Sequence, residues 1–127
     1  MAIRNELMLR LPNSPGALGR VCQLLADAKV GIQAMSLEPT GILRLVVDNP
    51  LSAAGLLTEM KYAVDQRDVL FIQLPNDAGG LYKATRLLSN VGINVEYAYG
   101  SSDEGQAMAA VVIGVDDVQR ASMAAGV

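Results

Sequence analysis

The sequence contains no histidine, no tryptophan, one phenylalanine and one cysteine. Without histidine, a Ser-His or Cys-His catalytic pair cannot form, and metal sites built from histidine and cysteine are excluded as well. The single cysteine, Cys22, has no partner for a disulfide within the chain, and its place in an apolar helical pattern predicts a packing role. These absences remove most familiar enzyme chemistry, so we expect no catalytic residues, no cofactor and no metal.

The sequence also has no large excess of charge of one sign and no long apolar run. Ten Lys plus Arg and thirteen Asp plus Glu give a net charge of −3, with both signs scattered along the chain. Such a surface does not suit a nucleic acid, which needs a basic patch and, for RNA, paired surface aromatics. No apolar stretch is long enough to span a bilayer, and residues 1–6 do not resemble a secretory signal. We therefore expect a cytoplasmic protein without nucleic-acid or membrane partners.

Two segments of the chain repeat each other. Leu11–Ser36 aligns without a gap on Leu74–Tyr99 at a shift of 63 positions. Identical residues recur at positions 11, 12, 13, 16, 18, 24 and 25 of the first copy. Self-similarity of this kind indicates two copies of one supersecondary unit. The sequence thus predicts two domains, residues 1–67 and residues 68–127.

The hydrophobic period changes in the same order in both copies. Apolar residues alternate over 7–11 and 70–74, which predicts an opening strand in each copy. Asn13-Ser14-Pro15 and Asn76-Asp77-Ala78 then offer capping side chains, with Pro15 at the first helical position, and an apolar stripe spaced 3, 1, 3 and 3 follows. Each copy therefore begins with a strand and a helix.

Further elements complete the pattern. We expect second strands at 30–37 and 93–99, third strands at 42–48 and 107–115, a second helix at 51–61, its counterpart after Asp116-Asp117, and a short closing strand at Tyr62–Val64. The predicted class is α+β. It consists of two tandem ferredoxin-like βαββαβ units, each an antiparallel sheet with helices on one face, and the second unit is truncated at its C-terminus.

The repeated LPNxxGxL element joins a strand end, a tight turn and a helix start. The unpaired N–H groups of a first helical turn suit a carboxylate. Gly16 and Gly79 lie where a side chain would obstruct a ligand, and Gly80 relaxes the second loop further. A purely structural use of proline and glycine in these turns is the alternative reading of the element.

In this combination the sequence resembles the ACT-domain family of small-molecule sensors, in its two-copy form. Asn13-Ser14-Pro15-Gly16-Ala17-Leu18 with Leu24-Leu25 is similar to the family's N/D-x-P-G-x-L loop and first helix, and Gly92-Ile93-Asn94-Val95 is similar to its "GINI" junction. The resemblance implies regulation of amino-acid metabolism through a bound amino acid or related metabolite, often beside an enzyme. It also implies a ligand between paired domains, held by loop N–H groups and walled by a second strand. The residues so implied are Asn13, Ser14, Gly16, Ala17, Leu18, Asn76, Asp77, Gly79, Gly80 and Leu81, with walls from Met35 and Ser36 or from Tyr97 and Tyr99.

Three features depart from the family pattern. Ala78 replaces the loop proline of the second copy, Lys29 replaces a glycine before the second strand, and the sequence ends eleven residues after Asp116. A second unit without a closing strand would leave the opening strand, Val69–Leu74, with an unpaired edge, which proteins cover or pair. We therefore expect a homodimer whose interface borders at least one ligand loop.

Two function classes remain open. The leading hypothesis is an amino-acid-binding regulatory protein, in which the loop N–H groups hold the ligand carboxylate. The alternative is an interaction module that docks on an enzyme of amino-acid metabolism without binding a ligand. Two acidic pairs could be taken for a metal site. We instead expect Asp103-Glu104 to lie in a polar turn and Asp116-Asp117 at a helix start, where carboxylates are favourable without a metal.

Overall fold

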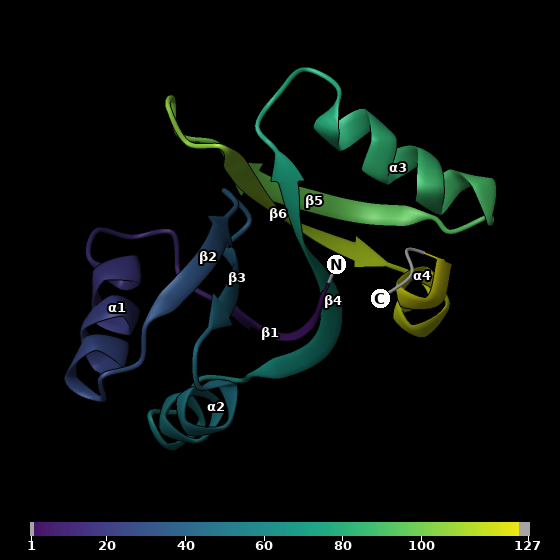
Figure 1. The fold of residues 1–127 in the computed structure, drawn as a ribbon. Coiled ribbons are helices and arrows are strands. Elements are labelled where there is room, and N and C mark those ends of the chain that lie inside the picture. Colours follow the sequence, from purple (N-terminus) through teal and green to yellow (C-terminus); the bar gives the residue numbers. More distant parts are fainter. Residues whose placement is uncertain (1, 125–127) are drawn as a thin grey trace. The chain divides into compact units, whose positions relative to one another are not determined.

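The computed structural model describes residues 2–124, which form two compact units. Residues 5–67 are the first unit, and residues 2–4 together with 68–124 are the second unit. Figure 1 traces the chain from purple through teal to yellow. The fold is α+β, with antiparallel strand pairs and four helices within residues 2–124. No helix in this range is long and apolar enough to cross a membrane.

The first unit contains two helices and an antiparallel sheet. Strand β3 pairs with β1 on one side and with β2 on the other. Its elements are β1 (Ala2–Arg10), α1 (Ala17–Asp27), β2 (Ile32–Leu37), β3 (Ile42–Val47) and α2 (Pro50–Glu59). The turns between them bring the end of β1, the start of α1 and the β2–β3 turn to the same place, as the bond from Leu11 N to Gly41 O (2.8 Å) shows.

The core of the first unit follows the alternation predicted for its opening strand. Leu7 and Leu9 are 0% and 1% exposed and pack with Leu43 and Leu45 of β3. Val21 and Leu25 of α1, together with Ala53 and Leu57 of α2, belong to the same cluster. Both helices therefore cover the face to which the odd-numbered residues of β1 point.

The second unit repeats this arrangement. Strand β6 pairs antiparallel with β4 and with β5. The unit is built from β4 (Asp65–Pro75), α3 (Gly80–Asn90), β5 (Val95–Ser101), β6 (Met108–Val115) and α4 (Val118–Ala124). Its core contains Leu70 and Ile72 of β4, Leu88 of α3 and Ile113 of β6.

The expected closing strand at Tyr62–Val64 is wrong. Those residues form no strand, and β4 instead runs without interruption from Asp65 to Pro75. The closing strand of the first copy and the opening strand of the second are thus one element. Local periodicity does not distinguish one long strand from two short ones, because the side-chain alternation is the same in both cases.

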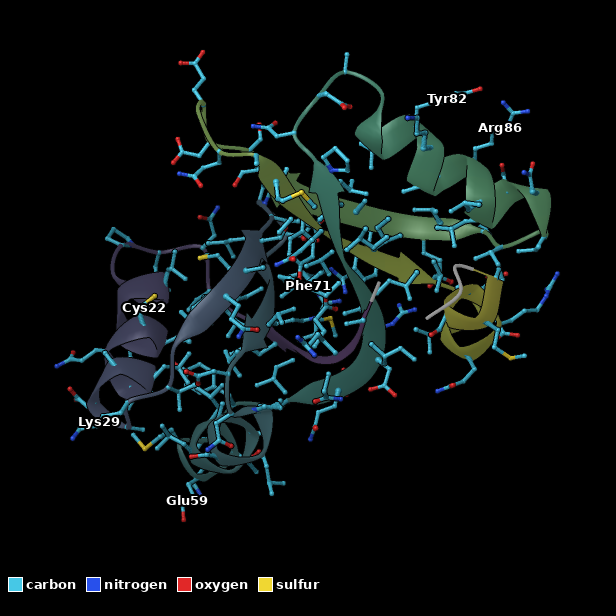
Figure 2. The ribbon with its side chains drawn as sticks, viewed as in Figure 1. Cys22, Lys29, Glu59, Phe71, Tyr82 and Arg86 are labelled. Carbon is cyan, nitrogen blue, oxygen red and sulfur yellow. The ribbon has the colours of Figure 1, made fainter. Side chains whose placement is uncertain are left out.

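The expected open edge along Val69–Leu74 is also absent. In the strand order, β4 lies between β6 and β1, and residues 2–4 of β1 belong to the second unit. Ile3 packs against the core of this unit, and the Arg4 guanidinium lies 5.8 Å from the centre of the Phe71 ring. Figure 2 labels Phe71 among the side chains of β4. The beginning of the chain therefore supplies the strand that the second copy lacks, and the argument for a dimer from that edge does not hold.

The acidic pairs after the third strands have structural partners. Asp116 Oδ1 accepts from Asn94 N at 3.2 Å, and Asp117 Oδ1 accepts from Arg120 N at 3.0 Å. In the first unit, the Asp48 and Asn49 side chains make the same two kinds of bond, to Gly31 N and Ser52 N. Within the described residues, no three acidic or cysteine side chains gather to hold a metal ion. These pairs fix a turn and cap a helix.

Candidate functional site

The loop between β1 and α1 leaves backbone donors open. Helix α1 follows an N-cap at Gly16, which has a φ of 82° and no side-chain cap. The first bond of the helix runs from Arg20 N to Gly16 O at 3.0 Å. The N–H groups of Leu18 and Gly19, the two residues before Arg20, have no acceptor in residues 2–124. This uncapped first turn combines two free donors with the positive end of the helix dipole.

The helix begins later than the sequence indicates. Pro15 was expected at the first helical position, but α1 begins at Ala17. Gly16 adopts a left-handed conformation that favours glycine, so the chain turns once more before the helix. The Ser14 side chain therefore does not cap α1.

A cavity of about 150 Å³ lies at this uncapped turn. Five residues predicted from the loop motif line it, namely Asn13, Ser14, Gly16, Ala17 and Leu18, and Gly19 adds its backbone. The opposite wall is formed by the end of β2 and the following turn, through Leu37, Glu38, Pro39 and Gly41. We call this space the first-loop cavity.

The position of the β2–β3 turn against the loop depends on one glycine. Gly41 has a φ of 92°, and a Cβ atom there would lie 2.3 Å from Leu11 O. Leu11 N donates to Gly41 O at 2.8 Å. A larger residue at 41 would push the turn away from the loop, so the close approach that shapes the first-loop cavity requires glycine.

Glu38 gives the first-loop cavity a charge that the sequence analysis missed. It is the acidic residue in a lining that otherwise consists of apolar, small and neutral polar residues. Its backbone N–H donates to Ile42 O at 3.0 Å and its carbonyl accepts from Gly41 N at 2.9 Å, which fixes the turn. The lining therefore includes the exposed acidic residue Glu38 on the turn wall, and Leu18 and Gly19, which have the open N–H groups, on the loop wall. The only signal in the sequence was an acidic residue in a turn, which usually means solvent exposure.

The second loop is closed by its own side chains. Asp77 Oδ1 accepts from Gly79 N at 3.0 Å, immediately before α3 begins at Gly80. Asn76 Nδ2 donates to Asp103 O at 3.1 Å and to Gln106 O at 3.0 Å. The loop thus carries a built-in anion at its helix start and is tied to the β5–β6 turn.

A cavity of about 230 Å³ lies beside this second loop. Among the predicted residues, Asn76, Asp77 and Leu81 line it, whereas Gly79 and Gly80 do not. Its other wall is the end of β5, including Gly100, Ser101 and Ser102. Ser101 occupies the place that Glu38 has in the first copy, at the shift of 63. The two copies therefore place their acidic residue on opposite walls: Asp77 lies beside the helix start in the second copy, and Glu38 lies on the turn across from the helix start in the first.

The predicted wall residues come earlier in their strands than the residues that line the cavities. Met35 and Ser36 precede Leu37, which is the β2 strand residue at the first-loop cavity. Tyr97 and Tyr99 stack with ring centroids 6.5 Å apart and an interplanar angle of 8°. The Tyr97 ring covers Gly114 on the paired strand β6, and neither tyrosine lines the cavity of the second loop. The structure thus places these four residues beside the cavities and not in their linings.

Solved structures share this fold. Protein BT0572 from Bacteroides thetaiotaomicron is similar over 98% of this chain and 87% of its own, with a TM-score of 0.90 and 29% sequence identity. The ligand-free regulatory subunit of aspartate kinase from Thermus thermophilus covers 99% and 96% at a TM-score of 0.66 and 15% identity. E. coli aspartokinase III in complex with lysine and aspartate covers 95% and 31% at a TM-score of 0.58 and 15% identity. The two kinase comparisons show a common fold.

Sequence comparison adds the family. No curated protein matches the chain. The family model described as the ACT domain pair matches residues 1–123, which is nearly the whole sequence. The chain therefore belongs to the ACT domain pair family.

Proposed function

We propose that this protein is a regulatory protein that binds a free amino acid in the first-loop cavity. The observation that carries the proposal is that Leu18 and Gly19, whose N–H groups are open, line the same cavity as Glu38. A ligand carboxylate accepts from the two N–H groups at the positive end of α1. The ligand ammonium group pairs with the Glu38 carboxylate across the cavity.

The size of the cavity fits this assignment. Drug-sized ligands occupy pockets of about 300–1,000 Å³, and the first-loop cavity has about 150 Å³. It accommodates the backbone end of an amino acid, and the ligand side chain extends over Leu37 and Pro39. The complex of E. coli aspartokinase III with lysine and aspartate supports an amino acid as the class of ligand.

We assign binding to the first loop and not to the second. Asp77 already places a carboxylate at the start of α3, where it accepts from Gly79 N. A second carboxylate from a ligand would meet like charge there. The 63-residue shift matches Asp77 with Ser14, which carries no charge. One chain therefore takes up one amino acid, in its first unit.

In this proposal the units are two ferredoxin-like domains, 1–67 and 68–127, with residues 2–4 completing the sheet of the second. Binding at the first loop alters the β2–β3 turn, because both walls of the cavity move with the ligand. A ligand that prefers one position of that turn shifts its equilibrium. The partner that responds to the new position of the β2–β3 turn is an enzyme of amino-acid metabolism.

Binding is tested by thermal unfolding in the presence of each of the twenty amino acids. A ligand at 100 times its Kd adds about 2.7 kcal/mol to the free energy of unfolding, which raises Tm by several degrees. We expect such a rise for one amino acid or a small chemical group of them. If all twenty at millimolar concentration leave Tm unchanged, the protein is an interaction module without a ligand.

Glu38→Gln is the control for the mode of binding. The amide keeps the size of the side chain and removes its charge, so we expect about tenfold weaker binding of the amino acid. Binding of the matching acid without an ammonium group should be the same in both proteins. An equal effect on both ligands would show that Glu38 shapes the turn and does not contact the ammonium group.

Strand β2 supports a homodimer. It stands at the end of the strand order with β3 as its neighbour, and three of its apolar side chains, Ile32, Met35 and Leu37, are 36–42% exposed. Pairing of two β2 strands would satisfy the free edge and cover these side chains next to the first-loop cavity. Light scattering at micromolar concentration should give twice the chain mass of 13.4 kDa. Leu37→Lys should give the mass of the monomer, and a dimer that this substitution leaves intact would contradict the interface.

A further inference from the structure

The first loop also lines a second cavity. This cavity has a volume of about 510 Å³ and lies between residues 12–17, the first turn of α1 and the residues that follow α2. Its polar side chains are Ser14, Arg20, Lys61 and Tyr62, and we call it the basic cavity. It shares loop residues with the first-loop cavity, but neither Leu18, Gly19 nor Glu38 lines it.

The charge of the basic cavity is of one sign. Arg20 and Lys61 line it, and no acidic residue does. Neither side chain has a salt bridge within the described part of the chain. On a protein of net charge −3, two unpaired cations that face one hollow are a local excess of positive charge. Two hydroxyl groups, from Ser14 and Tyr62, add neutral donors.

Hydrogen bonds of the backbone hold Lys61 in a left-handed conformation, which is unfavourable for lysine. Lys61 has a φ of 74° just after α2, where Lys61 N donates to Thr58 O and Tyr62 N to Leu57 O, both at 3.0 Å. This helix ending favours glycine, and the second unit has Gly92 with a φ of 73° after α3. A lysine in this conformation costs conformational energy, and a strained residue beside a cavity is a reason to ask about function.

We propose that the basic cavity binds a phosphate-bearing metabolite. Arg20 offers a planar guanidinium, which pairs with two phosphate oxygens, and Lys61 offers a compact charge. The Ser14 and Tyr62 hydroxyls complete the donors around the anion. A volume of about 510 Å³ has room for the organic part of a small metabolite as well as the phosphate.

The chain contains a matched control for Lys61. Lys29 follows α1 in the same way, with a φ of 59°, Lys29 N donating to Ala26 O at 3.0 Å and Val30 N donating to Leu25 O at 2.9 Å. Lys29 does not line the basic cavity, and Figure 2 shows it at the C-terminal end of α1. Glycine relieves the same backbone strain at both positions and removes the same charge. The two substitutions differ only in whether they remove a ligand contact.

The experiment titrates the full chain with inorganic phosphate and with glycerol phosphate at constant ionic strength, by calorimetry and by amide NMR shifts. We expect saturable binding, with shifts at Ser14, Arg20 and Tyr62. Lys61→Gly and Arg20→Gln should each weaken binding at least about tenfold, because each removes a hydrogen bond to a charged group. Lys29→Gly should leave the affinity unchanged. Both glycine variants should keep or raise Tm, so loss of binding cannot be assigned to unfolding.

Two results would overturn the proposal. One is the absence of saturable shifts around the basic cavity with either phosphate. The other is an equal loss of affinity in Lys61→Gly and Lys29→Gly, which would show attraction by overall charge. Amino-acid binding at the first-loop cavity is measured in the same variants and should not change. Its failure would concern the proposed function alone, because Arg20 and Lys61 do not line the first-loop cavity.

Discussion

A Ser14→Asp variant is expected to bind its amino acid about a hundredfold more weakly and to unfold at the same or a higher temperature. Position 14 matches Asp77 at the shift of 63, and Asp77 Oδ1 accepts from Gly79 N in the second loop. A carboxylate at 14 would sit at the uncapped start of α1. There it meets the ligand carboxylate with like charge, and a hundredfold loss corresponds to about 2.7 kcal/mol.

Although Ser14→Asp weakens ligand binding, its free energy of unfolding should stay the same or rise. A negative side chain at a helix N-terminus contributes about 0.3–1 kcal/mol, and α1 has no side-chain cap and no acidic residue in its first turn. Loss of binding together with unchanged or higher Tm is hard to obtain by damage to the fold. Isothermal calorimetry gives the affinity, and urea unfolding without ligand gives the free energy of unfolding.

Ser14→Asn is the matched control. Asparagine has the size and capping ability of aspartate without its charge, so we expect most of the affinity to remain. Asp77→Ser, in the other loop, should leave binding at the first loop unchanged. If Ser14→Asn weakens binding as much as Ser14→Asp, the shape of the loop is responsible. If neither changes the affinity, the ligand carboxylate is not at the start of α1.

The repeat made much of each unit predictable. Side-chain period and turn residues are local properties, and they placed the α1, β2, β3, β5 and β6 elements within a few residues of their observed bounds. The buried residues Leu7, Leu9, Val21 and Leu25 follow from the same periods. Asp77 was expected to cap the first helix of the second copy, but α3 has no side-chain cap, and the Asp77 carboxylate instead accepts from Gly79 N in the preceding turn.

What the sequence did not reveal is non-local. Whether Asp65–Pro75 is one strand or two depends on its neighbours in the sheet, and alternation says nothing about neighbours. The use of residues 2–4 by the second unit depends on contacts more than sixty positions away, such as the one between Arg4 and Phe71. A short C-terminal end therefore suggested a missing strand, although the chain supplies that strand from its beginning.

The candidate site also has parts that the sequence predicts and parts that it does not. The loops were recognisable because glycine, proline and a capping residue stand at fixed spacing. Glu38 and Gly41 were not, because a turn residue becomes part of a cavity wall only when the turn folds against another loop. Their partner in that contact, Leu11, is about thirty positions away in the sequence. The distinction between an open and a self-capped loop likewise came from bonds and not from residue types.

Arg44→Met is expected to lower the free energy of unfolding by about 3 kcal/mol. Arg44 Nη1 lies 3.3 Å from Glu6 Oε1, and the Glu6 side chain is fully buried while Arg44 is 18% exposed. Removal of the cation takes this ion pair away from a buried carboxylate, and such losses are about 3–5 kcal/mol. Methionine keeps the length of the side chain, so packing contributes less to the loss than charge. Urea unfolding at neutral pH measures the effect.

The double variant Glu6→Leu/Arg44→Met separates charge from volume. In the sheet, Glu6 is opposite Val46, which is also fully buried, and both point away from the helices that cover Leu7 and Leu9. A leucine there meets an apolar neighbour, so the double variant should recover most of the stability that Arg44→Met loses. The pair then serves to fix the register of β1 on β3, since a shift of one residue would move Glu6 to the core face. A double variant as unstable as Arg44→Met would instead assign the loss to packing around Arg44.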